Sequence, residues 1–256
     1  MIDARAVVDP SAKIGADVHI GPYAIIGADV EIGRGTRIEP HAVLKGPTVI
    51  GADNHIFQFA SIGDEPQDKK YNGEPTRLVI GDRNKIREAC TINRGTVQDL
   101  GVTTIGNDNW IMAYCHIAHD CVVGDNTIFA NNASIAGHVR VGDHAILGGF
   151  TGVHQFCAIG AHSFCSMFTS VTKDVLAYVT VSGMPAEARG INSEGLKRRG
   201  FTADQIRNIR EAYRVTFRQG LTVEEALAEL TPRLAEQPEL KLFLDSLRES
   251  NRGIAR

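Results

Sequence analysis

The chain has 256 residues, a formal net charge of −3, a pI near 6.3 and 43% hydrophobic residues. This length and apolar content are enough for one large buried core, and the mildly acidic charge excludes the basic footprint of a nonspecific nucleic-acid binder. No apolar run is long enough to span a membrane, and residues 1–10 lack the layout of a signal peptide. We therefore expect a cytoplasmic protein with no membrane span and no nucleic-acid partner.

Branched apolar residues recur at every sixth position through most of the chain. The series runs from Val8 to Ile62, from Ile80 to Ile92 and, one residue out of register, from Ile105 to Val171. A glycine often follows the aliphatic residue, and a small residue usually stands four places after it. Helical or heptad spacing would place these residues differently. The period predicts a mainly β fold, a parallel β-helix of hexapeptide repeats in which three short strands make one 18-residue coil.

All five cysteines fall within this repeat. Four of them occupy the small inward position and one the aliphatic position. We therefore expect reduced thiols packed in the core, not disulfides, catalytic thiols or metal ligands. The residues concerned are Cys90, Cys115, Cys121, Cys157 and Cys165.

Two segments interrupt the repeat. Residues 63–79 are polar and contain two prolines, and residues 94–104 form a shorter break. Both are expected to loop out from a corner of the coil, either as sites of ligand contact or as tolerated insertions.

Beyond Val171 the repeat fades, and the pattern becomes helical near residue 192. This predicts a β-helix domain over 1–191 and a small C-terminal α-helical domain over 192–256. Ser193 is the expected cap of a short helix, and Thr202 and Thr222 each begin a capping-box pattern. Apolar residues at helical spacing are expected to pack inward, namely Ile206, Ile209, Tyr213, Phe217, Leu240, Phe243 and Leu247.

Histidines gather in the later coils. Because residues 18 apart stack, His119 should lie on Gly137, beside His138, so that His119, His138 and His154 line one edge with His116 nearby. Such a row suits either a zinc site or acid/base work by one imidazole. Asp120 would point away from His119 on a flat strand, so a contact between them requires turn geometry.

Basic residues also cluster in two places. Lys69, Lys70 and Arg77 lie in the first interruption, and residues 197–199 read Lys-Arg-Arg. Arginine forks suit phosphate, so an anionic substrate is one interpretation and a solvated charged face is the other.

In order and spacing, the chain resembles the bacterial UDP-N-acetylglucosamine O-acyltransferases of lipid A synthesis on the motifs DKKYNGEPTRLVIGD, HIAHDC, NNASIAGHV, TGVHQFCAIGAH and NSEGLKRRGF. The resemblance implies a left-handed coil. It also implies transfer of an (R)-3-hydroxyacyl chain from acyl carrier protein to the glucosamine 3-hydroxyl of UDP-N-acetylglucosamine. The family forms homotrimers with active sites between neighbouring prisms, and it uses no metal and no cofactor beyond the carrier's phosphopantetheine.

The same resemblance assigns roles to residues. His119 would be the general base, Asp120 would orient it, and the Gly137 amide would face the thioester oxyanion in a direct transfer without an acyl-enzyme. Arg198 and Arg199 are the expected diphosphate contacts. The residues implied to bind or position substrate are Gln67, Asp68, Lys70, His116, His138, His154, Gln155, Asn192, Glu194, Arg198 and Arg199.

Two positions depart from the family pattern. Asn93 stands where a histidine is common, and Met167 stands where long-chain members have glycine at the floor of the acyl groove. Met167 should shorten the groove and favour a medium chain of the 3-hydroxydecanoyl kind. Arg207, Arg210 and Arg214 are candidates for steering the acidic carrier protein.

The sequence leaves open a 3-amino in place of a 3-hydroxy acceptor. The rivals from other classes are a zinc hydratase resembling the γ-type carbonic anhydrases and a non-catalytic β-helical scaffold.

Overall fold

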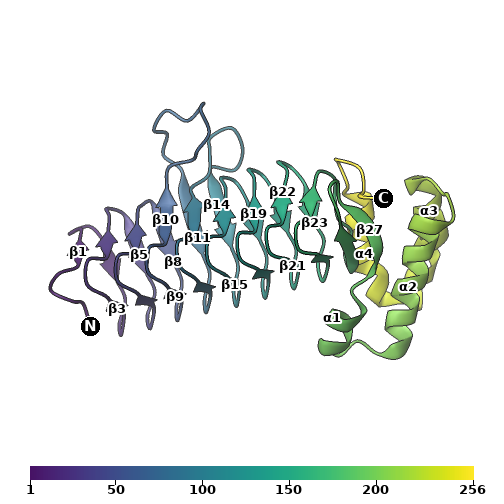
Figure 1. The fold of residues 1–256 in the computed structure, drawn as a ribbon, viewed down its shortest axis with the longest axis horizontal. Coiled ribbons are helices and arrows are strands. Elements are labelled where there is room, and N and C mark those ends of the chain that lie inside the picture. Colours follow the sequence, from purple (N-terminus) through teal and green to yellow (C-terminus); the bar gives the residue numbers. More distant parts are fainter.

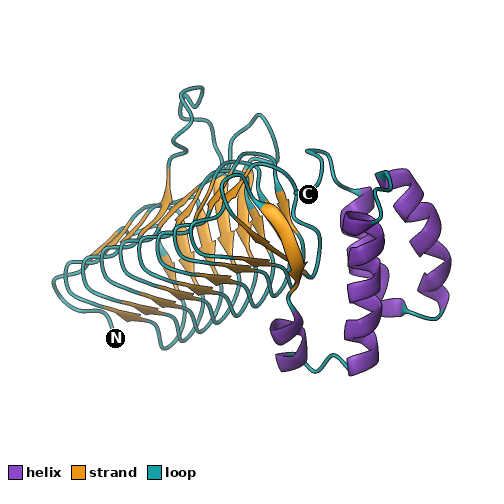
Figure 2. Ribbon diagram, turned by 45° about the vertical axis from the view of Figure 1, so that its right-hand side comes forward, coloured by secondary structure: helices purple, strands orange, loops and turns teal.

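A computed structural model describes residues 1–256 as a three-sided prism of stacked coils followed by a helical domain (Figure 1). Each coil contributes one strand to each of three sheets, and all strands up to β26 pair in parallel. The helices pack at the C-terminal end of the prism (Figure 2). None of them combines the length and apolar character that a membrane crossing needs.

The first sheet contains β1 (Val7–Val8), β4 (Ile25–Ile26), β7 (Val43–Leu44), β10 (Ser61–Asp64), β13 (Thr91–Asn93), β16 (His116–Ile117), β19 (Ser134–Ile135), β22 (Gly152–Val153) and β25 (Ser170–Val171). The second sheet contains β2 (Lys13–Ile14), β5 (Val30–Ile32), β8 (Thr48–Ile50), β11 (Arg77–Ile80), β14 (Val102–Ile105), β17 (Val122–Val123), β20 (Arg140–Val141) and β23 (Ala158–Ile159). The third sheet contains β3 (His19–Ile20), β6 (Arg37–Ile38), β9 (His55–Ile56), β12 (Lys85–Ile86), β15 (Trp110–Ile111), β18 (Ile128–Phe129), β21 (Ile146–Leu147), β24 (Phe164–Cys165), β26 (Val179–Ser182) and β27 (Glu187–Ile191).

Three six-residue repeats make one coil, so residues 18 positions apart pair between adjacent coils. Ile20, Ile38 and Ile56 pair directly across adjacent coils, and all three are buried. Where a glycine follows the aliphatic residue, it permits close stacking of the turns, since a Cβ on Gly33 would meet the Gly51 carbonyl of the next coil. All five cysteines are buried and free, as predicted.

Three kinds of corner join the sheets. We call the turns from the first to the second sheet the site corner, those from the second to the third sheet the helix corner, and those from the third to the first sheet the aromatic corner. Most turns hold one non-glycine residue in the left-handed region, such as Asp120 at the site corner.

Both interruptions emerge at the site corner, but they are shorter than predicted. The first loop covers 65–76, because β10 continues to Asp64 and β11 already begins at Arg77. The second covers 94–101, because β14 begins at Val102 and pairs with β11 from Arg77 onwards. The ends of these strands are polar, so the apolar pattern does not mark them as strands. They are strands because they pair with the strands that flank the other excursion.

The chain changes architecture after β26, where β27 turns back and pairs with it antiparallel. The helical elements are α1 (Ser193–Arg198), α2 (Ala203–Arg218), α3 (Val223–Leu230), the 3₁₀ turns η1 (Thr231–Ala235) and η2 (Pro238–Leu240), and α4 (Lys241–Arg248). Both predicted capping boxes are present. The cap of α1 is Asn192, not Ser193, because the Asn192 side chain accepts from the Gly195 N–H. The predicted apolar stripes pack inward, with Phe217 only partly buried.

Candidate active site

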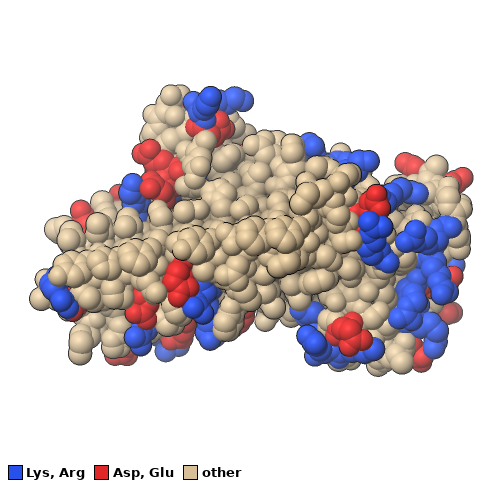
Figure 3. All heavy atoms as spheres, viewed as in Figure 1, with Lys and Arg blue, Asp and Glu red and all other residues tan.

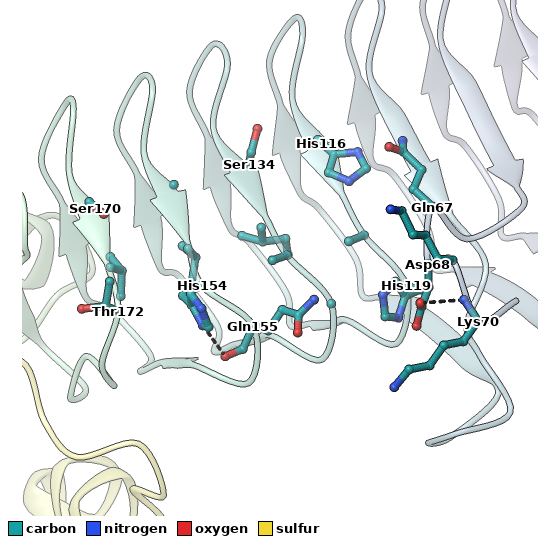
Figure 4. A pocket seen from close by; sticks show the side chains of 18 residues that line it. Gln67, Asp68, Lys70, His116, His119, Ser134, His154, Gln155, Ser170 and Thr172 are labelled. Atoms are coloured by element: carbon teal, nitrogen blue, oxygen red, sulfur yellow. Dashed lines mark hydrogen bonds between the residues drawn. The ribbon is translucent and has the colours of Figure 1, made fainter.

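Three successive turns of the site corner bring the histidines together. His119 and Asp120 lie in one turn, Gly137 and His138 in the next, and Gln155 and Phe156 in the third. The stacking interval places His138 against Phe156 with ring centroids 4.3 Å apart and edge-on to His119 at 5.0 Å. Figure 4 shows His116 and His119 projecting from one coil and His154 from a coil two further along, with Gln67, Asp68 and Lys70 of the first excursion at one end.

His119 and Asp120 form a hydrogen-bonded pair. The His119 Nδ1 atom lies 2.9 Å from the Asp120 Oδ2 atom, and both residues are buried. Adjacent residues of a flat strand would point apart, but Asp120 has a φ of 57°, and this left-handed turn brings its carboxylate back to the imidazole. Donation from Nδ1 to a carboxylate leaves Nε2 of a neutral imidazole free to accept a proton.

Thr96 fixes the far side of the Asp120 carboxylate. Its N–H donates to both Asp120 oxygens at 2.9 and 3.0 Å, and its hydroxyl donates to Oδ2 at 2.6 Å. Burial acts to raise the pKa of the Asp120 carboxyl, but the hydrogen bonds from His119 and Thr96 outweigh it and hold this pKa below its usual value. Asp120 therefore stays ionised while it orients His119.

Gly137 supplies the space for the His119 ring. A Cβ at Gly137 would come within 2.6 Å of the His119 Nε2 atom, so any larger residue would displace the imidazole. The Gly137 N–H donates no hydrogen bond within the chain. A free backbone donor thus lies beside the free nitrogen of His119, which is the arrangement that an oxyanion and its general base require.

A hollow of about 780 Å³ extends from this pair over the first sheet. Eight of the predicted site residues line it, namely Gln67, Asp68, Lys70, His116, His119, Gly137, His154 and Gln155. Within it, His116 Nδ1 is held 2.7 Å from the Thr91 hydroxyl. Burial, and secondarily the charge of His119, lowers the pKa of His116, which favours a neutral hydrogen-bonding ring there. The hollow offers lysine ammonium groups, imidazoles and amides to a polar, anionic ligand.

Other predicted site residues lie elsewhere in the single chain. His138 and Asp120 face a second hollow of about 420 Å³, on the second-sheet side of the corner. Asn192 and Arg199 donate hydrogen bonds to the carbonyls of His162 and His144 at the helix corner. Asn192, Glu194, Arg198 and Arg199 do not line the first hollow. Met167 is exposed at the aromatic corner and lines neither hollow.

The contributions of the second excursion were not predictable from the sequence. Thr96 carries no distinctive signal, because threonine stands at the small position of the repeat in other coils too, as at Thr48 and Thr151. Asp99, whose Oδ2 atom lies 2.7 Å from His138 Nδ1, gave no signal because its loop lies outside the repeat. Asn93, at the departure from the family pattern, donates to the Glu65 carbonyl at 2.7 Å and so fixes the base of the first excursion.

The six-residue repeat and the site corner first indicate the class of protein. Residues 11–46 and 103–137 match the bacterial transferase hexapeptide family of six-residue repeats. Residues 174–255 match the model described as domain 2 of UDP-N-acetylglucosamine O-acyltransferase.

Full-length relatives narrow this class to one family. The acyl-[acyl-carrier-protein]–UDP-N-acetylglucosamine O-acyltransferase of Stutzerimonas stutzeri is 58% identical over 100% of this chain and 99% of that protein. Solved structures of LpxA from Acinetobacter baumannii and of UDP-N-acetylglucosamine O-acyltransferase from Moraxella catarrhalis each give a TM-score of 0.98. They are 52% and 51% identical to this chain and cover 100% of it and 99% of their own chains. The chain belongs to the UDP-N-acetylglucosamine O-acyltransferase family, and the predicted left-handed β-helix is confirmed.

Proposed function

We propose that this protein transfers an (R)-3-hydroxyacyl chain from acyl carrier protein to the 3-hydroxyl of UDP-N-acetylglucosamine in lipid A synthesis. The observation that carries the proposal is the buried His119–Asp120 pair lying over Gly137 at one end of the larger hollow. The names of the full-length relatives supply the donor and the acceptor. The five free, buried cysteines agree with the cytoplasm as the site of this reaction.

The reaction follows from the free atoms of the pair. His119 Nε2 takes the proton of the sugar hydroxyl while the oxygen attacks the thioester carbonyl carbon. The Gly137 N–H stabilises the oxyanion of the tetrahedral intermediate. The carbon–sulfur bond then breaks, and the imidazolium returns its proton to the departing phosphopantetheine thiolate. No acyl-enzyme is needed, in keeping with the burial of every cysteine thiol.

The complete site is proposed to form in a homotrimer. In one chain, Asn192, Glu194, Arg198 and Arg199 lie away from the larger hollow and would reach that of a neighbouring copy. The aromatic corner offers a contact surface, since Tyr114, Phe59 and Phe150 are 65%, 62% and 50% exposed.

Light scattering should give the mass of three chains. Mixed trimers of His119→Ala and Arg198→Ala chains should regain activity, because some sites would then be intact; mixtures as inactive as the parents would contradict shared sites.

Donor docking is proposed at the helical domain, where Lys and Arg side chains gather (Figure 3). Arg189, Arg210, Arg214 and Arg218 surround a hollow of about 290 Å³ there. Of the three arginines predicted to steer the carrier, Arg207 is paired with Asp204 at 2.7 Å, whereas Arg210 contacts only the Ser193 hydroxyl. Arg210 therefore keeps more of its charge available for an acidic partner.

The rival zinc hydratase has one observation in its favour. Ligand atoms of His119, Asp120 and His138 all lie within 4.8 Å of one another, which is close enough to share a cation. However, His119 and Asp120 already bond to each other, and Thr96 donates three hydrogen bonds to the Asp120 carboxylate. An ion would have to displace these bonds, so we favour the metal-free transfer with no cofactor beyond the carrier's phosphopantetheine.

The deciding experiment is a transfer assay that pairs UDP-N-acetylglucosamine with a series of 3-hydroxyacyl carrier proteins. We expect turnover with the 3-hydroxy sugar, highest for a medium chain. His119→Ala should lower kcat by roughly 10²- to 10⁴-fold without changing the melting temperature. His19→Ala, at the far end of the prism, should have the kcat of the wild type. Turnover only with the 3-amino analogue, or full activity of His119→Ala, would overturn the assignment.

A further inference from the structure

The second excursion, residues 94–101, is folded tightly over the site corner. The Thr96 carbonyl accepts from the N–H of Gly101 at 3.0 Å and from that of Asp99 at 3.4 Å. These bonds close the loop on Thr96, the residue that fixes the Asp120 carboxylate. The loop is thus attached to the catalytic pair at its base, and its tip carries a second carboxylate, Asp99.

Asp99 makes the same kind of contact with His138 that Asp120 makes with His119. Its Oδ2 atom lies 2.7 Å from His138 Nδ1. The His138 ring also stacks on Phe156, at an interplanar angle of 6°, and stands edge-on to His119. Stacking fixes the plane of the ring but does not decide which ring nitrogen carries the proton. The contact with Asp99 alone decides which ring nitrogen carries the proton, because Nε2 of His138 has no partner within the chain.

A carboxylate that accepts a hydrogen bond from the Nδ1–H group of a neutral histidine leaves Nε2 as a hydrogen-bond acceptor. We propose that Asp99 is a positioning residue that sets the tautomer and orientation of His138. The second excursion then holds both imidazole–carboxylate pairs of the site in one arrangement, with Thr96 acting on the first pair and Asp99 on the second. This inference rests on the acyl transfer proposed above and adds a residue to which the family resemblance gives no role.

A surface ion pair without consequence is the competing explanation, since the Asp99 side chain is 41% exposed. Such exposed pairs contribute little to stability. The two explanations differ in one respect. An inert pair predicts no change in catalysis when Asp99 is removed, whereas a positioning residue predicts a change that depends on His138 being present.

The experiment is a double-mutant cycle in the full-length protein with Asp99→Ala, His138→Ala and the two combined. We expect Asp99→Ala to lower kcat about tenfold, with the KM for the sugar nucleotide and the melting temperature unchanged. In the His138→Ala background the same change should have an effect of less than about twofold, because coupled residues are non-additive. Asp99→Glu should restore part of the activity. Gln98→Ala, in the same loop, controls for disturbance of the loop itself.

Ring nitrogen spectra of histidine-labelled protein test the inference without turnover. The signal lost in His138→Ala identifies His138, and we expect it to report the Nδ1–H tautomer in the wild type and to change in Asp99→Ala. An unchanged tautomer, or equal losses of kcat in both backgrounds, would overturn the role of Asp99. An inactive wild type with the expected spectra would instead count against the acyl transfer alone.

Discussion

The imidazole of His119 occupies the space above the α-carbon of Gly137, one coil further along the prism. Gly137→Ala should therefore push the ring away from the reacting atoms and lower kcat about 100-fold, the loss expected for a displacement of about 1 Å. Gly27→Ala adds the same methyl group near the other end of the prism, where the nearest atom is the Leu44 carbonyl oxygen at 3.2 Å, and its effect on kcat should be far smaller. Steady-state rates and thermal unfolding of both variants check this. Similar losses in both variants would show that His119 is not the cause.

Met167 is predicted to limit the acyl chain. Its side chain is 60% exposed at the aromatic corner, and its Cε atom lies 3.6 Å from the place of a Cβ on Gly149. Met167→Gly should lengthen the groove and shift the preference towards longer 3-hydroxyacyl carriers by at least about tenfold, since one methylene is worth roughly 1–3 kcal/mol of discrimination. Competition between carriers of two lengths measures the shift. Met184→Ala, at another exposed methionine, should leave the preference as it is.

Charge on α2 should control the affinity for the carrier protein. Arg210→Glu should raise the KM for acyl carrier protein about tenfold at low salt, and the difference should shrink as salt screens the contact. Arg207→Glu is the matched variant, because Arg207 is already paired with Asp204, and its effect should be smaller. Rates measured across ionic strength distinguish them. Equal effects of the two variants would indicate general charge and not a docking site.

Removal of metal ions should leave turnover intact. Protein dialysed against a chelator is expected to keep its transfer rate within about twofold, because the Asp120 carboxylate is already bound by His119 and Thr96. Elemental analysis alongside the rate measurement completes the test. Stoichiometric zinc that tracks with activity would establish the rival metal mechanism.

His162, at the helix corner, should make the fold sensitive to acid. Burial, followed by the charges of His144 and Arg199, lowers the pKa of His162 to about 4, from an ordinary 6.5. The unfolded chain then takes up the proton before the folded chain does, so stability is lost as pH falls from about 6.5 to about 4, by up to about 3 kcal/mol.

Urea unfolding across this pH range measures the loss. His162→Phe should reduce it, leaving the smaller contribution of His144, whose pKa is also lowered by burial. His19→Phe, at the other end of the prism, is the control. A pH dependence unchanged by His162→Phe would contradict this origin.

The repeat was predictable because one physical requirement, an inward aliphatic residue, recurs every six residues and fixes both strand and register. Ile38 and Phe129 therefore fell where the period placed them. The repeat could not predict the His119–Asp120 contact, which only the family resemblance implied, because the contact depends on the left-handed φ of Asp120. Thr96 and Asp99 act from a loop whose path no periodicity describes. The cap of α1 was misplaced by one residue because Asn192 and Ser193 are both good capping residues.

The antiparallel strand β27 has a consequence for how the molecule meets other copies of itself. A stack of parallel strands ends in an edge whose unpaired N–H and carbonyl groups can recruit another chain into a fibre. β27 covers that edge of the third sheet at β26, and the last turns of the chain bond to Asp174 beneath the second sheet. The C-terminal segments thus also block end-to-end association of prisms, and a prism that lacks them would be prone to fibrillar aggregation.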